Sequence, residues 1–167
     1  MCGAELSKLP DGVKRVMSFL QAEGYSQSPR ILEDAACTAQ QAADALGVEL
    51  GQIAKSIIFR RKSDNVAVLV ITSGDKRVDE AKVQTLVCEG SAKLGRADAT
   101  FVKLKTGFAI GGVAPVAHLT PPVTLLDSEL FRFTTVWAAA GHPNAVFEIA
   151  PHALQKLVNV PIADVVI

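Results

Sequence analysis

Two apolar segments separated by a short polar turn set the narrowest limits on how this chain can fold. Ile53, Ile57 and Phe59 share one face of a period-two pattern, and residues 66–72 are mostly β-branched. Both patterns are typical of strands. Turn-forming residues, Asp64-Asn65 and Ser73-Gly74, bound the second segment. We therefore predict an antiparallel hairpin over 53–72.

Helices and further strands are predicted on both sides of this hairpin. Residues 12–23 have apolar side chains at helical spacing, and Thr38 with Gln41 forms a capping pattern that opens a helix over 39–46. Segment 98–106 fits a strand or a short helix, and we favour the helix because Gly107 follows it. Further helices are predicted over 79–88 and from Pro151, and strands over 123–126, 135–140 and 146–149, with a turn at 141–144.

This order of elements is mixed and does not alternate single strands with single helices. It favours an α+β fold with a curled, mostly antiparallel, barrel-like mixed sheet surrounded by helices. The length of 167 residues is that of one domain, and we expect residues 1–167 to form a single one.

Charge and composition exclude several classes of protein. The 17 basic residues balance the 17 acidic ones, which argues against coating long duplexes through many phosphate contacts but leaves a short nucleic-acid end open as a ligand. Cys2, Cys37 and Cys88 have no spacing typical of disulfides or zinc sites, so no metal and no cofactor are expected. No signal-peptide pattern and no apolar run of about 18 residues occurs, so we expect a cytoplasmic protein without a membrane partner.

Lys55 departs from the pattern of its strand. It shares the alternation of Ile53 and Ile57, which places an ammonium on an apolar face. A buried charge must be paired or take part in chemistry, because its desolvation costs several kcal/mol. Alternatively, Lys55 reaches solvent past the rim of the core. Farther along, the run 60–62 (Arg-Arg-Lys) is either a solvated strand end or a phosphate contact.

A glycine-rich segment over 107–118 is the second unusual feature. Its apolar side chains and Pro115 indicate an ordered loop, and the pair Gly111-Gly112 would let backbone N–H groups approach a phosphate or an ester oxyanion. A tight structural turn would use the same residues. His118 and His142 lie in or beside glycine-containing turns, where an imidazole is either presented to a pocket or simply exposed.

The sequence gives no support to a serine nucleophile. There is no Gly-x-Ser-x-Gly elbow, and Ser56 and Ser73 have no sequence-local partner. Trp137 and Phe147 are expected to fill the core, although an aromatic ring near a pocket could also stack on a base.

Three motifs in this order resemble the YbaK/ProX family of aminoacyl-tRNA editing domains, which are related to the editing insertion of bacterial prolyl-tRNA synthetase. The motifs are Ile53-Ala-Lys-Ser-Ile-Ile-Phe59, Gly111-Gly-Val-Ala-Pro-Val-Ala-His118 and Ala140-Gly-His-Pro143. The resemblance runs over nearly the whole chain. It implies a hydrolase that cuts the ester bond of mischarged aminoacyl-tRNA, and we expect it to act in trans.

The resemblance also implies roles for residues. The strand lysine most tied to activity in the family matches Lys55, and the Gly-x-x-x-Pro loop that cradles the aminoacyl moiety matches Gly111 to Pro115. It implies catalytic roles for Lys55, Gly111 and His142, and substrate contacts by Ile53, Gly112, Val113, Ala114, Pro115, His118 and Gly141. Ala117 stands where the family often has a second glycine, so a less open backbone is expected there.

The implied partner is the 3′ acceptor end of aminoacyl-tRNA, most often tRNA for proline in this family, and prolyl-tRNA synthetase is a further implied partner. Alanine, cysteine, serine, threonine and 2-aminobutyrate all remain open as the amino acid removed. No residue stands out as a general base, which favours catalysis by positioning and electrostatics. A noncatalytic module that binds an aminoacyl-adenosine or a tRNA end, and a hydrolase of another small ester, are the alternatives.

Overall fold

The computed structural model describes residues 9–26, 28–33 and 38–167. The helices are α2 (Asp11–Ala22), α3 (Ala39–Leu46), α4 (Glu80–Val87), α5 (Ala99–Thr106) and α6 (Pro151–Val158), with short 3-10 helices η1 (Leu50–Gln52) and η2 (Ser128–Arg132). The strands are β1 (Arg30–Ile31), β2 (Ile53–Arg61), β3 (Val66–Ser73), β4 (Leu94–Arg96), β5 (Val123–Asp127), β6 (Val136–His142), β7 (Ala145–Ile149) and β8 (Ile162–Ala163).

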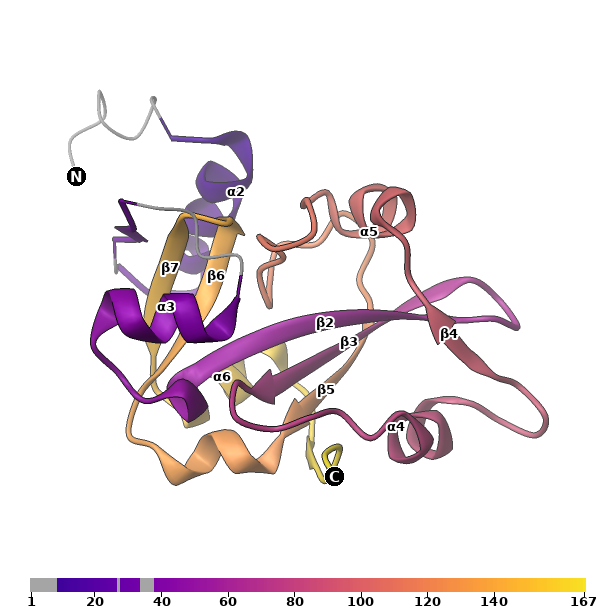
Figure 1. Cartoon of the computed structure of the whole chain (residues 1–167). Coiled ribbons are helices and arrows are strands. Elements are labelled where there is room, and N and C mark those ends of the chain that lie inside the picture. Colours follow the sequence, from indigo (N-terminus) through magenta and orange to yellow (C-terminus); the bar gives the residue numbers. More distant parts are fainter. Residues whose placement is uncertain (1–8, 27, 34–37) are drawn as a thin grey trace.

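The described strands form one eight-stranded mixed sheet in the order β1-β7-β6-β2-β3-β5-β8, with β4 paired to β2. The pairs β1–β7, β2–β3, β2–β4 and β6–β7 are antiparallel, whereas β2–β6, β3–β5 and β5–β8 are parallel. Figure 1 shows β6 and β7 running steeply across the direction of β2 and β3, so the sheet is strongly curled. The predicted fold class is confirmed, and the described sheet stays open between its end strands β1 and β8.

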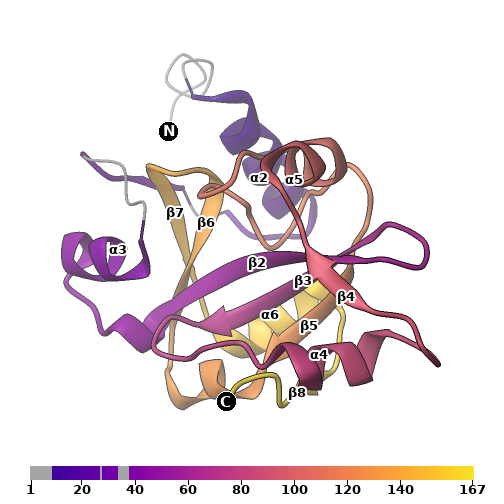
Figure 2. The same cartoon turned by 45° about the vertical axis from the view of Figure 1, so that its right-hand side comes forward.

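The β2–β3 hairpin is the centre of the fold, as predicted. Its register runs from Ala54 opposite Ser73 to Arg61 opposite Val66. Helices cover both faces of it: α2 and α5 lie on one side and α4 on the other (Figure 2). One core cluster joins α2 and Phe108 to Ile58, and a second joins α4 and the C-terminal segment to Phe59. Burial on both faces explains why β3 is an almost uninterrupted apolar run.

Local capping explains where the helices begin and end. Thr38 accepts a hydrogen bond from the backbone N–H of Gln41 and forms the predicted capping box of α3, which ends at Gly47 in the left-handed conformation. The ambiguous segment is the helix α5, because Asp98 caps its start and Gly107 ends it with a φ of 82°. The favoured interpretation of that segment is confirmed.

The shortest strands were not predicted from the sequence. Strands β1, β4 and β8 have two or three residues each, too few to show a period. Strand β6 extends through Gly141 to His142, beyond its predicted end, and pairs irregularly with β7 there. Cys88 is a free thiol, whereas Cys2 and Cys37 lie outside the described residues. Within the described ranges, no helix is both long and apolar enough to cross a membrane.

Candidate active site

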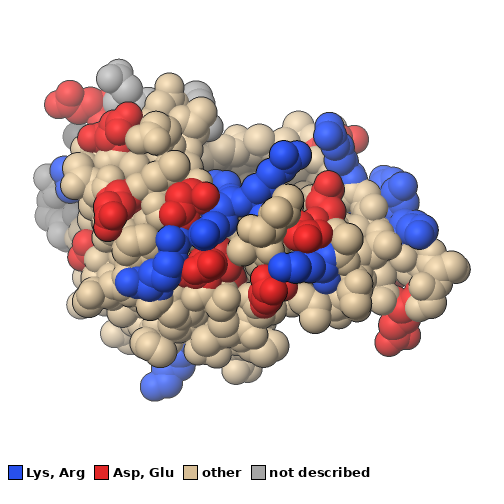
Figure 3. Space-filling view, turned by 60° about the horizontal axis from the view of Figure 1, so that its bottom comes forward, with Lys and Arg blue, Asp and Glu red and all other residues tan. Residues whose placement is uncertain are grey.

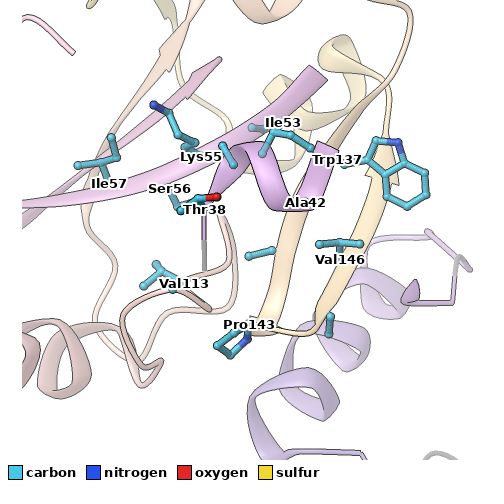
Figure 4. A pocket seen from close by; sticks show the side chains of 15 residues that line it. Thr38, Ala42, Ile53, Lys55, Ser56, Ile57, Val113, Trp137, Pro143 and Val146 are labelled. Carbon is cyan, nitrogen blue, oxygen red and sulfur yellow. The ribbon is translucent and has the colours of Figure 1, made fainter. Parts of the chain in front are cut away.

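A cavity of about 220 Å³ lies beside β2, between the residues that pair with β6 and those that pair with β4. On this edge of β2, β6 pairs only with Ile53 and Ala54, and β4 pairs only from Phe59 onward. No described strand pairs with the stretch between them on that edge, so part of the β2 backbone faces the cavity. The lining comprises Thr38, which caps α3, Ala39 and Ala42 of α3, residues 53–57 of β2, Gly111, Val113, Trp137, Ala139, Pro143, Ala145 and Val146 (Figure 4).

The glycine loop and the glycine-histidine turn touch through their backbones. A Cβ atom on Gly112 would lie 2.8 Å from the Cα of His142, so only glycine permits this approach. On the other side of the turn, a Cβ atom on Gly141 would meet the carbonyl oxygen of Gly12 at 2.4 Å. Gly111 and Gly141 have φ angles of 92° and 93°, which L side chains rarely adopt. The structure thus joins two of the three sequence motifs.

Lys55 lines the cavity, but its ammonium is directed away from the cavity. Figure 4 shows its side chain on the opposite side of β2 from Ser56, directed away from Val113 and Pro143. Its Nζ donates a hydrogen bond to the carbonyl of Lys76 at 3.1 Å. Burial lowers the pKa of Lys55, and the charges of Asp75 and Asp127 partly offset this by raising it. The Lys55 side chain is half-buried, and it forms no direct ion pair among the described residues.

His142 is not among the residues that line the cavity, although its chain neighbour Pro143 and the nearby Ala139 are. Its Nδ1 accepts a hydrogen bond from the backbone N–H of Asn144 at 3.1 Å. In the neutral ring the proton is therefore on Nε2, which can donate to a ligand group.

His118 is not brought to the Lys55 cavity. Its Nε2 bonds the carbonyl of Ala114 at 2.6 Å, and its ring packs edge-on against Phe108 with centroids 5.6 Å apart. With Pro115 it lines a different cavity, of about 300 Å³, on the far side of the loop. Burial lowers the pKa of His118 and outweighs the hydrogen bond to Ala114, which raises it. These contacts hold the loop in place.

Arg15 of α2 also holds this loop, and no sequence pattern predicted that role. Its Nε donates to the carbonyl of Ala117 at 2.8 Å and its Nη2 to the carbonyl of Thr106 at 2.7 Å. The guanidinium lies 4.2 Å from the ring centroid of Phe108. Ala117 itself has a φ of 64°, the left-handed conformation that explains why a glycine suits this position. Nothing in a helical pattern signals that an arginine far away in sequence holds this loop.

Ser56 also lies in the site, although the sequence assigned it no role there. It lines both the Lys55 cavity and an adjoining, mostly apolar cavity of about 260 Å³, bounded also by Ile58, Val102 and Ile110. Its Oγ is buried and has no hydrogen-bond partner among the described residues. Leaving a hydroxyl unpaired costs about 1–3 kcal/mol, which a polar ligand group could recover. The Nε1 of Trp137, another residue that lines the cavity, is also buried and without a hydrogen-bond partner among the described residues.

Of the predicted site residues, Ile53, Lys55, Gly111 and Val113 line one cavity, and Gly112, Gly141 and His142 support its wall. Ala114 and Pro115 are buried in the loop behind it. Within the described part of the chain, no cluster of His, Cys, Asp and Glu could hold a metal ion.

Comparison with known proteins identifies the family of the chain. Residues 33–157 match the model of the aminoacyl-tRNA editing domain family. The chain is 36% identical over 124 residues to the uncharacterised protein YwhH of Bacillus subtilis, covering 74% of this chain and 76% of YwhH. It is 26% identical over 128 residues to EbsC of Enterococcus faecalis, a candidate Cys-tRNA(Pro)/Cys-tRNA(Cys) deacylase, covering 77% and 76% of the two chains.

Among solved structures, a crystal structure of a candidate trans-editing enzyme for prolyl tRNA synthetase superimposes with a TM-score of 0.87. The two sequences are 37% identical, and the match covers 96% of this chain and 99% of the other. The chain belongs to the aminoacyl-tRNA editing domain family, of the YbaK/ProX type that its motifs predict.

Proposed function

We propose that the whole chain acts as one editing domain in the cytoplasm and hydrolyses, in trans, the ester bond of tRNA charged with a wrong, small amino acid. The observation that carries this proposal is the cavity on the open edge of β2, which brings the Lys55 strand, the Gly111 loop and α3 together. The preferred substrate is tRNA for proline, a choice supported by the similarity to EbsC and to the trans-editing structure.

The size of the cavity supports a small aminoacyl group. Its volume of about 220 Å³ lies below the roughly 300–1,000 Å³ of pockets for drug-sized ligands. A second, separate pocket of this kind is useful because a synthetase gains only about 1–3 kcal/mol of discrimination per methylene group. Amino acids smaller than proline, or isosteric with it, therefore need removal after the charging step.

Backbone N–H groups of the loop are proposed to stabilise the developing oxyanion of the ester. The N–H of Gly112 already donates to the carbonyl of Ala109 at 3.0 Å, so it is not the donor. The N–H groups of Gly111 and Val113 make no hydrogen bond among the described residues, and both residues line the cavity. Fixed donors of this kind are commonly worth a factor of about 10²–10³ in rate.

The side chains are proposed to orient the substrate while water attacks the ester. Lys55 would hold the terminal adenosine through its phosphate or ribose, and His142, next to Pro143 of the cavity wall, would contact the carbonyl or amine region. No carboxylate or unpaired imidazole lines the cavity within the described residues, so no side chain there is assigned as general base. Positioning and electrostatics would supply most of the acceleration.

The far end of β2 supports contact with the tRNA backbone. Arg61 is paired with Asp64 at 2.8 Å. Its neighbours Arg60 and Lys62 form no ion pair among the described residues, and neither does Lys93, which precedes β4 and whose carbonyl accepts from the N–H of Lys62. By contrast, Figure 3 shows basic and acidic side chains interspersed on the face viewed from the side of η2 and α4. The end of β2, with Arg60, Lys62 and Lys93, is therefore the better place for phosphates.

Multiple-turnover deacylation of tRNA(Pro) charged with alanine, cysteine, serine, threonine or 2-aminobutyrate tests the proposal. We expect rapid hydrolysis of at least one species by the wild type and its loss in Lys55→Ala. The exposed Lys156→Ala, on α6, is the matched control and should retain full activity. Binding without turnover across the panel would instead favour the noncatalytic module, and hydrolysis of simple esters without tRNA would favour a general esterase.

A further inference from the structure

The turn that follows β3 is held by contacts from three directions. Ser73 Oγ donates to the carbonyl of Gly51, and the backbone N–H of Ser73 donates to Asp127 at 3.0 Å. Asp127 is fully buried and also accepts from the hydroxyl of Thr72 at 3.0 Å. The N–H of Lys76 closes the turn onto the carbonyl of Ser73 at 3.0 Å. The end of this turn therefore has a fixed position, and its Lys76 carbonyl is the acceptor for Lys55.

Arg132 of η2 braces the same turn from the outside. Its Nη1 and Nη2 contact the two carboxylate oxygens of Asp75 at 3.0 and 2.7 Å, and Nη2 also donates to Ser73 Oγ at 2.8 Å. Its Nε donates to the carbonyl of Glu129 at 2.8 Å, which fixes the fork to its own helix. The hydrogen bond from Arg132 is the main reason that the pKa of Asp75 lies below its ordinary value. A two-point fork of this kind fixes direction as well as distance.

The backbone leaves this turn no room to shift. A Cβ atom on Gly74 would lie 2.3 Å from the carbonyl oxygen of Leu50, and one on Gly51 would lie 2.7 Å from the ring of Phe133 and 3.0 Å from Asp75. The guanidinium of Arg132 lies 4.9 Å from the same Phe133 ring centroid. The turn, η1 and η2 therefore form one packed unit beside the start of β2.

We propose that Arg132 is a positioning residue for Lys55: through Asp75 and Ser73 it fixes the turn whose Lys76 carbonyl holds the Lys55 ammonium. The proposal rests on the proposed function only in assuming that Lys55 acts on the substrate. Nothing in the three sequence motifs points to Arg132, which lies in a segment of 3-10 helix that they do not include. Its role comes from the contacts alone.

The charges around the Lys55 ammonium set the direction of the test. Asp75 and Asp127 attract it, and burial opposes its charge. Lys76 is paired with Glu129 at 3.7 Å, so its own ammonium is directed to that carboxylate. Replacing Arg132 by methionine removes a cation from the cluster and releases the turn, so that water reaches Lys55. Both changes raise the Lys55 pKa; displacement of Asp75 opposes them, but burial is the larger influence on this ammonium, so the pKa should rise toward its ordinary value.

The experiment follows the titration of the Lys55 side chain by NMR in the full chain labelled with ¹³C-lysine. The Lys55 signal is assigned by its absence in Lys55→Ala. We expect Arg132→Met to raise the titration midpoint and to lower single-turnover deacylation by roughly 10- to 100-fold, since displacement by about 1 Å can cost that much. Arg132→Lys, which keeps the charge without the fork, should shift the midpoint less and rescue the rate in part.

The matched control is Lys82→Met, which breaks another surface ion pair, to Asp164 at 3.0 Å, and should change neither reading. An unchanged Lys55 midpoint in Arg132→Met, whether or not the rate falls, overturns the proposal because a merely structural role would then suffice. If Arg132→Met does not fold, the midpoint in Arg132→Lys decides in the same way. If the wild type hydrolyses no aminoacyl-tRNA, the proposed function fails, whereas the titration still decides whether Arg132 positions Lys55.

Discussion

Replacing Gly112 by alanine separates the two backbone segments that meet at the cavity wall. The new Cβ would lie 2.8, 2.9 and 3.0 Å from the Cα, C and N atoms of His142, whereas ordinary contact begins at about 3.4 Å. The loop and the turn must therefore part by roughly 0.6 Å. A displacement of about 1 Å can cost a factor of about 10² in rate, so we expect roughly a tenfold loss in deacylation. Overpacking of this kind also lowers the free energy of unfolding by about 1–3 kcal/mol.

The measurements are single-turnover deacylation of the best substrate and thermal unfolding, in which 1 kcal/mol corresponds to about 2–4 °C for a chain of this size. Gly90→Ala is the matched control, because Gly90 has a φ of 59° and open space around it. It should lose stability through backbone strain and keep its activity.

Gly111→Ala separates strain from collision within the site itself. Gly111 has a φ of 92°, and the nearest atom to a new Cβ, in Pro143, is 3.8 Å away. A Gly112→Ala variant with the rate and melting temperature of the wild type would refute the reasoning, because the close approach to His142 would then set neither property.

Three further outcomes are expected. Ala117→Gly should raise the free energy of unfolding in urea by about 0.5–1 kcal/mol, because it removes a left-handed alanine with φ of 64°; Ala45→Gly, inside α3, should lower it by about 1 kcal/mol. Burial lowers the pKa of His118, so the unfolded chain binds the proton more readily and stability should fall as the pH drops below about 6.5; His118→Gln should flatten this dependence in urea titrations from pH 5 to 7. Changing Lys62 and Lys93 to glutamate should lower kcat/KM and its salt dependence for whole tRNA but not for a short aminoacyl-adenosine ester.

Much of the fold could be predicted because its longest elements carry local signals. Around Asp64-Asn65, one segment shows a period of two and the other is rich in β-branched residues, and the antiparallel hairpin predicted from them is confirmed. Capping residues fixed the bounds of α3 within the residues predicted, because Thr38 and Gly47 act through neighbours only a few positions away. Such signals depend on the chain nearby and need no knowledge of the tertiary structure.

The candidate site could be predicted only in part, because its parts meet through contacts distant in sequence. Lys55 stands out in the sequence, yet the carbonyl that holds its ammonium belongs to Lys76, and the turn-forming pair Ser73-Gly74 does not indicate that contact. His118 was expected at the substrate, but it holds the far side of the loop. Arg15 and Arg132 had no signal at all, since an arginine on a helix surface looks the same whether it reaches solvent or a distant carbonyl.

The glycine motifs and the cavity lining carry different information about substrate choice. Gly112, Gly141 and Gly74 are positions where one backbone lies against another and no side chain fits. They fix the shape of the site but make no choice between amino acids. The choice must come from side chains that face the cavities, and among these Ser56 offers an unpaired hydroxyl at the boundary between the two. A small amino acid that bears its own polar group would gain a hydrogen bond there, whereas alanine would leave the hydroxyl unpaired. Ser56→Ala should therefore lower the deacylation rate of tRNA charged with serine or cysteine more than that of tRNA charged with alanine.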